Sequence, residues 1–237
     1  MHKSIKLFCL PYAGGSAMVY TKWRKYLNPW ITLHPVEMAG RGKRFQIPLY
    51  QSFPEAVDDL CRMIQPELLH HNPYAFFGHS MGSFLVYELT RKLIALNYPE
   101  PAHLFLSGRY PPHIKKEEKV YHLLPEEEFR KEILEMGGTP PEVFEHQELL
   151  DIFLPILRAD YKILETYESP ACETRFGCPI TTLLGDQDKD VSKDDMEQWR
   201  DYTTNQFDSY QFDGGHFFIN EKTEAVVKII NQHLSVI

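Results

Sequence analysis

The sequence of 237 residues has no run of 18 or more apolar residues, the length that a membrane-spanning helix requires. The apolar stretch before Pro11 is too short for the core of a signal peptide, so we expect a cytoplasmic protein that does not insert into a membrane. Basic residues are the minority, since 25 Lys and Arg stand against 33 Asp and Glu and the formal net charge is -8. Nucleic-acid-binding domains usually carry a basic excess, so this balance argues against a nucleic-acid partner.

Cysteine is scarce, and none of the four residues belongs to the paired spacing of a zinc site or a redox motif. They are Cys9, Cys61, Cys172 and Cys178. We therefore expect free thiols and no metal site. Internal repeats and low-complexity tracts are absent as well. With an apolar content of 43%, the chain can bury one large core, and we expect a single domain over residues 1–237.

Short apolar segments alternate with longer segments of helical periodicity through most of the chain. This alternation is typical of the α/β class, with a mostly parallel central sheet flanked by helices. The pattern predicts strands at 5–10, 31–38, 74–77, 103–107, 180–184 and 209–212, and helices at 20–27, 53–69, 83–96, 194–203 and 223–234. Residues 109–175 interrupt it, because they are charged, helical in period and without an evident strand. We expect this stretch to be a helical insertion between two strands.

A five-residue motif follows the apolar segment at 74–77. Gly78-His79-Ser80-Met81-Gly82 matches the G-x-S-x-G elbow of α/β-hydrolases, in which a sharp strand-to-helix turn exposes a nucleophilic serine. Glycines at both ends let strand and helix approach closely. The motif alone could be a glycine-rich helix start with an incidental serine. Its position between a strand and a strong helix favours Ser80 as nucleophile and the backbone N–H of Met81 as an oxyanion donor.

A serine nucleophile needs a base, and the base needs an orienting acid. In the order Ser…Asp/Glu…His, His216 fits the base, since it follows a predicted strand and two glycines. The acid should follow the strand at 180–184, at the sheet edge where active sites of α/β proteins lie. Three aspartates compete there, Asp186, Asp188 and Asp190. The spacing Gly-x-x-Asp-x-x-Val favours Asp188, with Asp190 as the main alternative.

A second oxyanion donor is expected from the loop after the first strand, Leu10-Pro11-Tyr12-Ala13-Gly14-Gly15-Ser16. Its glycines let the backbone turn inward, and Ala13 is the candidate donor. The alternatives are a plain glycine-rich turn or a phosphate loop. The segment has neither the Lys-Ser/Thr of a P-loop nor the third glycine of a dinucleotide fingerprint.

Four segments together resemble the type II thioesterases that accompany nonribosomal peptide and polyketide synthases. They are residues 11–16, the Gly40-Arg41-Gly42 turn, residues 78–82, and Gly214-Gly215-His216-Phe217-Phe218. The four segments occur in the same order as in that family, and together they span nearly the whole chain. One departure is Met38-Ala39 before the Gly-Arg-Gly turn, where the family usually has proline.

The resemblance implies an α/β-hydrolase that cleaves acyl groups from the phosphopantetheine thiol of carrier proteins and so clears misprimed or stalled intermediates. It implies that residues 109–175 form a mobile lid over an acyl chamber and that neither metal nor cofactor takes part. We expect a monomer. A carboxylesterase or an acyltransferase could use the same triad, and a silent carrier-binding module would need a broken one.

Carrier domains are generally acidic, which conflicts with the negative charge of this chain. A local basic patch could resolve the conflict, although dispersed solubilising charge explains the same residues equally well. The candidates for the patch are Arg41, Lys43, Arg44, Lys115 and Lys116.

Overall fold

The computed structural model describes residues 4–68, 72–116, 119–139, 141–169 and 175–235. Cys172 and the last residue of the helix expected at 53–69 lie outside these ranges. The other three cysteines are buried free thiols. Within the described ranges, no helix is long and apolar enough to cross a membrane.

The described residues form one six-stranded sheet in which every neighbouring pair of strands is parallel. The strand order is β2-β1-β3-β4-β5-β6. This result confirms the α/β class and the mostly parallel sheet expected from the alternating pattern. The strands are β1 (Ile5–Leu10), β2 (Ile31–Pro35), β3 (Tyr74–His79), β4 (His103–Ser107), β5 (Ile180–Gly185) and β6 (Phe207–Phe212).

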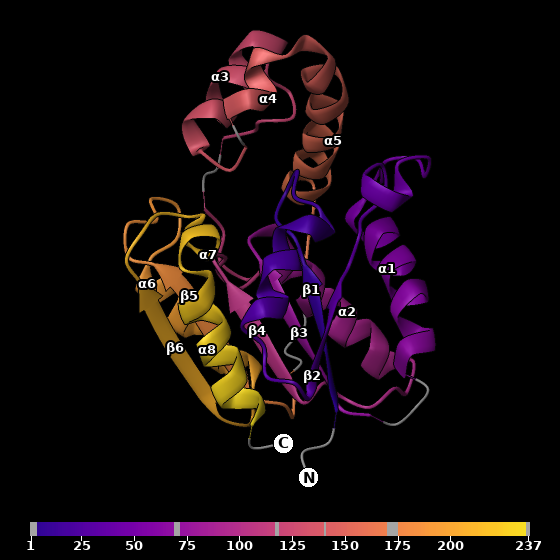
Figure 1. The fold of residues 1–237 in the computed structure, drawn as a ribbon, viewed down its shortest axis with the longest axis vertical. Helices are drawn as coiled ribbons and strands as arrows, with labels where there is room; N and C mark the ends of the chain where they lie inside the picture. Colours follow the sequence, from indigo (N-terminus) through magenta and orange to yellow (C-terminus); the bar gives the residue numbers. More distant parts are fainter. Residues whose placement is uncertain (1–3, 69–71, 117–118, 140, 170–174, 236–237) are drawn as a thin grey trace.

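Helices lie on both faces of the sheet (Figure 1). The longer ones are α1 (Phe53–Leu68), α2 (Met81–Ala95), α3 (Glu126–Met136), α5 (Gln147–Glu165) and α8 (Thr223–Leu234). The shorter ones are α4 (Pro141–Glu145), α6 (Lys193–Glu197), α7 (Phe218–Glu221) and the 3-10 segments η1 (Ala17–Lys25), η2 (Gly42–Arg44) and η3 (Gln198–Tyr202).

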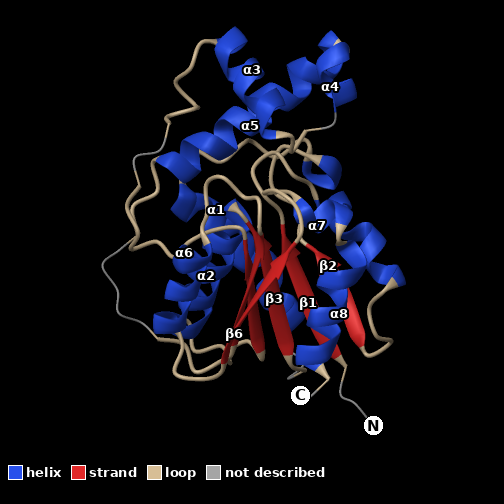
Figure 2. Ribbon diagram, turned by 90° about the vertical axis from the view of Figure 1, so that its left-hand side faces the viewer, coloured by secondary structure: helices blue, strands red, loops and turns tan. Residues whose placement is uncertain are grey.

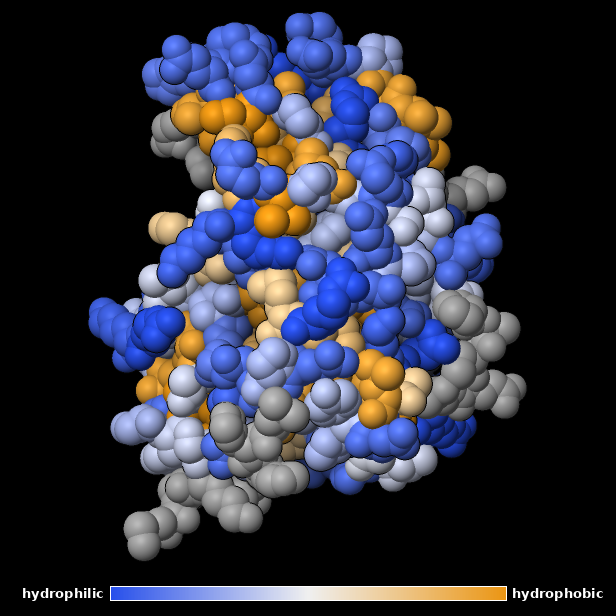
Figure 3. All heavy atoms as spheres, turned by 90° about the vertical axis from the view of Figure 1, so that its right-hand side faces the viewer, coloured by the Kyte–Doolittle hydropathy of each residue, from blue (hydrophilic) through white to orange (hydrophobic). Residues whose placement is uncertain are grey.

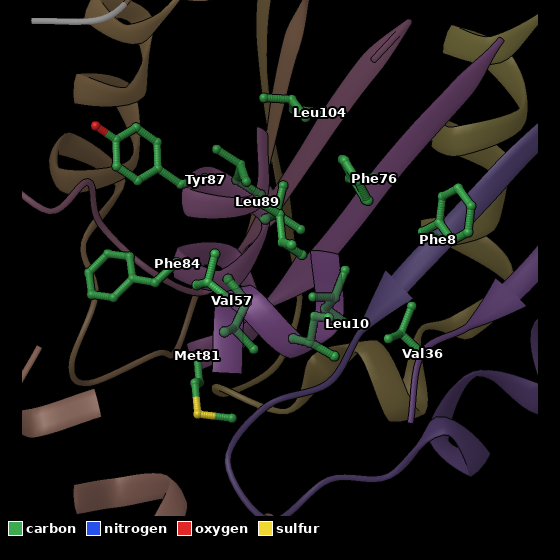
Figure 4. Packing of buried hydrophobic residues seen from close by; sticks show 14 of the residues in the cluster. Phe8, Leu10, Val36, Val57, Phe76, Met81, Phe84, Tyr87, Leu89 and Leu104 are labelled. Atoms are coloured by element: carbon green, nitrogen blue, oxygen red, sulfur yellow. The ribbon is translucent and has the colours of Figure 1, made fainter. Parts of the chain in front are cut away.

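Alternate residues of the strands enter two separate cores, as the two-residue period of a strand requires. Phe8 of β1 and Phe76 of β3 pack with α1 and α2 on one face (Figure 4). Leu7 and Phe77, one residue away along the same strands, pack with η1 and α8 on the other. The central strands are buried on both faces, which explains their nearly continuous apolar sequences.

Residues 109–175 supply α3, α4 and α5 between β4 and β5. These helices lie above the carboxyl ends of the strands (Figure 2). A third apolar cluster joins them, built around Phe129, Leu150 and Leu154. Apolar side chains are visible on this upper part of the surface (Figure 3). Several large ones from the insertion are exposed, namely Val120, Leu123, Leu134, Leu149 and Ile152.

Several element boundaries differ from the sequence expectation. β3 continues through Gly78 and His79, which pair with β4, although glycine is a poor strand former and ended the apolar pattern. The strand expected at 31–38 ends at Pro35, although the Val36 N–H still donates to Cys9 O of β1 at 2.9 Å. The segment 17–25 is a 3-10 helix, and the helix expected at 194–203 is divided into α6 and η3.

Candidate active site

Ser80 lies at the sharp turn between β3 and α2, with φ +53° and ψ -118°. A non-glycine residue with positive φ is strained, and such strain persists only where neighbouring structure enforces it. Here the Ser80 N–H donates to Ser107 O at 2.7 Å, while its carbonyl accepts from Ser83 N–H at 2.9 Å. The turn therefore has the geometry of a nucleophile elbow.

The two motif glycines are required by close backbone contacts. A Cβ added at Gly78 would lie 2.2 Å from the carbonyl oxygen of Gly82, and one added at Gly82 would lie 2.3 Å from Leu10 O. Real Cβ atoms essentially never approach backbone this closely. The absence of side chains at these positions lets α2 begin directly against β3 and β1.

Asp188 and His216 meet at the carboxyl edge of the sheet. His216 Nδ1 lies 2.7 Å from Asp188 Oδ2, and the Asp188 side chain is fully buried. Asp188 Oδ1 also accepts the backbone N–H groups of Asp190 and Val191. Burial alone raises the pKa of Asp188, but the His216 hydrogen bond and the two N–H donors together hold that pKa below its ordinary value. An ionised Asp188 keeps the proton on Nδ1 and leaves Nε2 as the basic nitrogen.

The competing aspartates have other contacts. Asp186 Oδ1 accepts the Gly214 N–H at 3.1 Å and is exposed. Asp190 is also exposed, and its backbone carbonyl accepts from Lys116 Nζ at 2.8 Å. Of the three candidates, Asp188 is the one whose carboxylate bonds to the His216 ring in the structure.

One cavity of about 640 Å³ brings the expected site residues together. Ser80, His216 and Ala13 all line it, and the insertion contributes Tyr121 and Tyr161 among other residues. Met81, the other expected oxyanion donor, is the first residue of α2 and is fully buried. A nucleophile, a base and the loop after β1 thus border one chamber beneath the insertion, an arrangement suited to acyl transfer through a serine.

His79 is a neighbour of the site whose contacts the sequence did not reveal. It is completely buried, with Nδ1 2.8 Å from Ser107 Oγ and its ring centroid 5.1 Å from that of His216. Burial, and then the proximity of His216, lowers the pKa of His79 well below its ordinary value. A neutral His79 adds packing against the His216 ring without adding a competing charge.

One expected member of the basic patch, Arg41, does not lie on the surface. Arg41 is buried and bonds to Asp160 of α5, 119 residues away. Arg44 forms an ion pair with Asp59 and Lys116 forms one with Asp195, while Lys43 and Lys115 are exposed. A buried guanidinium cannot contribute to a surface patch. No group of three His, Cys, Asp or Glu side chains suited to a metal occurs in the part of the chain that the structure describes.

The model of the thioesterase domain family matches residues 5–234. A protein of Brevibacillus parabrevis named linear gramicidin dehydrogenase LgrE is 38% identical over 97% of this chain and 88% of its own length. The gramicidin S biosynthesis protein GrsT of Aneurinibacillus migulanus is 35% identical over 98% and 90%.

Solved structures of similar sequence share the fold of this chain. The crystal structure of ClbQ, from the colibactin NRPS/PKS pathway, has a TM-score of 0.93 at 39% identity and covers 99% of this chain and 98% of that one. RedJ, a thioesterase from the prodiginine biosynthetic pathway of Streptomyces coelicolor, has a TM-score of 0.90 at 30% identity, with 98% and 91% covered. The likeness extends through the insertion as well as the sheet.

Proposed function

Because this chain belongs to the thioesterase domain family, we propose that it removes acyl groups from the phosphopantetheine thiol of carrier proteins and clears misprimed or stalled intermediates of a nonribosomal peptide or polyketide synthase. It is an α/β-hydrolase of the serine type. The observation that carries the proposal is the hydrogen bond between Asp188 and His216, because His216 and Ser80 line the same cavity.

The proposed reaction has two halves. Ser80 Oγ attacks the acyl carbon while His216 Nε2 takes its proton, and the N–H groups of Ala13 and Met81 bind the oxyanion. The thiol leaves with the proton from His216. Water then attacks the acyl-enzyme with His216 again as base, which releases the free acid and restores Ser80. Asp188 stabilises the imidazolium formed in each half.

The proposed partners are acyl or peptidyl carrier domains that present the pantetheine arm at the cavity under residues 109–175. GrsT and ClbQ are named for pathways that build peptides or polyketides, which supports this class of partner. The exposed apolar side chains of the insertion provide a surface for an acyl chain or a carrier. The proposal includes a monomer that works in the cytoplasm.

The name of LgrE describes a dehydrogenase, an activity that the sequence and topology of this chain do not favour. The loop after β1 has Gly14 and Gly15 but lacks the third glycine of a dinucleotide fingerprint. The strand order β2-β1-β3-β4-β5-β6 also differs from the 3-2-1-4-5-6 order of the dinucleotide-binding fold.

Hydrolysis of acyl groups loaded on several carrier proteins tests the proposal. The wild-type chain should hydrolyse these thioesters faster than simple oxygen esters and without an added alcohol or amine acceptor. Ser80→Ala should lower turnover by several powers of ten, and Ser209→Ala in β6 is the matched control that should retain it. Full activity of Ser80→Ala would contradict the assignment. Faster oxygen-ester cleavage would favour a carboxylesterase, and a strict need for an acceptor would favour an acyltransferase.

A further inference from the structure

A buried ion pair joins the insertion to the loop after β1. Arg41 and Asp160 bond through both pairs of atoms at 2.7 Å, and their side chains are 5% and 2% exposed. Asp160 belongs to α5, whereas Arg41 follows β2. Both partners also bond to the loop, since Asp160 Oδ2 accepts the Gly14 N–H at 2.8 Å and Arg41 Nη1 donates to Gly15 O at 3.0 Å.

The loop held in this way is a tight turn. The Gly15 N–H donates to Tyr12 O at 2.9 Å, and Gly14 has φ +76°, as the third residue of a type II turn requires. Tyr12 O belongs to the peptide group that carries the Ala13 N–H. The direction of that N–H therefore depends on the turn, and the turn is fixed at Gly14 by Asp160 and at Gly15 by Arg41.

The same face of α5 covers the turn with apolar atoms. A Cβ added at Gly14 would lie 2.5 Å from Leu157 Cδ1 and 3.1 Å from Phe153 Cζ. Phe153, Leu157 and Asp160 are spaced by four and three residues, so they share one side of the helix. This part of α5 therefore packs directly against the turn.

We propose that Asp160, held by Arg41, is a positioning residue for the oxyanion hole. Its carboxylate binds the Gly14 N–H and thereby keeps the Ala13 N–H directed at the oxygen of the tetrahedral intermediate. The inference rests on the proposed function, in which Ala13 is an oxyanion donor. It predicts that loss of the acceptor at position 160 weakens binding of the transition state more than binding of the substrate.

Single truncations test this poorly, because removing one partner of a buried ion pair leaves an uncompensated charge and can unfold the chain. Two neutral double variants avoid that problem. Arg41→Met/Asp160→Asn keeps an oxygen that can accept the Gly14 N–H, whereas Arg41→Met/Asp160→Leu has a side chain of similar size without an acceptor. Both lack buried charge, so both should fold, with a melting temperature lowered by the backbone groups that are left unpaired.

The expected results differ between the two variants. Arg41→Met/Asp160→Leu should lose about 10²-fold in kcat with little change in KM, the size of effect seen when one oxyanion donor is removed. Arg41→Met/Asp160→Asn lacks the Arg41–Gly15 bond but keeps an acceptor for the Gly14 N–H, so its kcat should be at least about tenfold higher than that of the Leu variant. Affinity for an alkyl boronic acid, whose boron forms a tetrahedral adduct with serine, should fall in parallel with kcat.

A matched control removes another Arg–Asp pair of the same length. Arg44 and Asp59 are 2.7 Å apart, and within the described ranges none of their hydrogen bonds reaches residues 12–15. Arg44→Met/Asp59→Leu should keep both kcat and boronate affinity, whatever its effect on melting temperature. Equal kcat in the two Asp160 variants, or unchanged boronate affinity in Arg41→Met/Asp160→Leu, would overturn the inference. A wild-type chain that hydrolyses neither carrier thioesters nor esters would instead refute the proposed function.

Discussion

At the scale of single residues, the Asp188 carboxylate determines which nitrogen of His216 carries the proton. Asp188→Asn replaces an acceptor by an amide that can donate to Nδ1, which favours the wrong tautomer. We expect kcat to fall about 10⁴-fold, as for the same change in other serine triads, with KM nearly unchanged. Steady-state thioester hydrolysis measures this effect.

The neighbouring aspartate provides the control for that measurement. Asp190 contacts Lys116 through its backbone carbonyl and its side chain is exposed, so Asp190→Asn should leave kcat within a few-fold of the wild type. If Asp190→Asn is the crippling change and Asp188→Asn is active, the choice of acid is wrong.

How far single residues could be predicted depended on local context. Glycines at fixed spacing on both sides identified Ser80. The Gly-x-x-Asp-x-x-Val spacing favoured Asp188, and in the structure its carboxylate bonds to His216. Arg41 and Asp160 have no comparable signal, because their bond joins segments 119 residues apart. A charged residue in sequence looks solvated unless its distant partner is known, and for this reason Arg41 was expected on the surface.

At the scale of elements, the approach of α2 to β1 depends on a missing side chain. A methyl group at Gly82 would meet Leu10 O at 2.3 Å, and backbone cannot yield as the end of a flexible side chain can. Gly82→Ala should therefore lower the free energy of unfolding by about 1–3 kcal/mol, the usual cost of overpacking. Urea denaturation measures the loss.

Gly215 offers a comparison for that stability measurement. A Cβ there has no atom within 4 Å and its φ is not in the left-handed region, so Gly215→Ala should change the free energy of unfolding by no more than about 0.5 kcal/mol. If the two variants have the same free energy of unfolding, the close approach of α2 to β1 does not require a glycine at position 82.

Element types were more predictable than element ends. Apolar periodicity gave all six strands of the described sheet, because buried parallel strands are apolar on both faces. The ends depend on pairing, which single segments do not encode. Gly78 and His79 join β3 because β4 offers them partners. The helical character of residues 109–175 was evident from periodicity, whereas the anchoring of α5 on the turn after β1 depends on contacts between distant segments.

At the scale of the whole molecule, two buried neutral histidines make stability depend on pH. His103 of β4 stacks on Phe105, bonds to Thr181 Oγ1 at 2.8 Å and lies near His233. Burial, and then His233, lowers the pKa of His103 from 6.5 to about 3. Burial likewise lowers the pKa of His79. The unfolded chain therefore binds protons at these positions below pH 6.5 while the folded chain does not.

This difference fixes the sign of the effect. The free energy of unfolding should be greatest above pH 6.5 and fall as the pH decreases, with His103 alone costing about 2 kcal/mol at pH 5. Asp188, whose pKa is lowered, contributes stability that is lost only as the pH falls below its ordinary value of 3.8, so the window from pH 7 to 5 isolates the histidines.

His103→Gln tests the origin of that loss, because glutamine can still bond to Thr181 but does not titrate. Urea denaturation at several pH values should show that the free energy of unfolding changes between pH 7 and 5 by about 1 kcal/mol per pH unit less than in the wild type. Thr181→Val removes the hydrogen bond but keeps the imidazole, so it should lower stability at every pH and retain the slope. An unchanged slope in His103→Gln would mean that His103 takes up its proton equally in the folded and unfolded chains, and that its burial in β4 does not exclude the charged form.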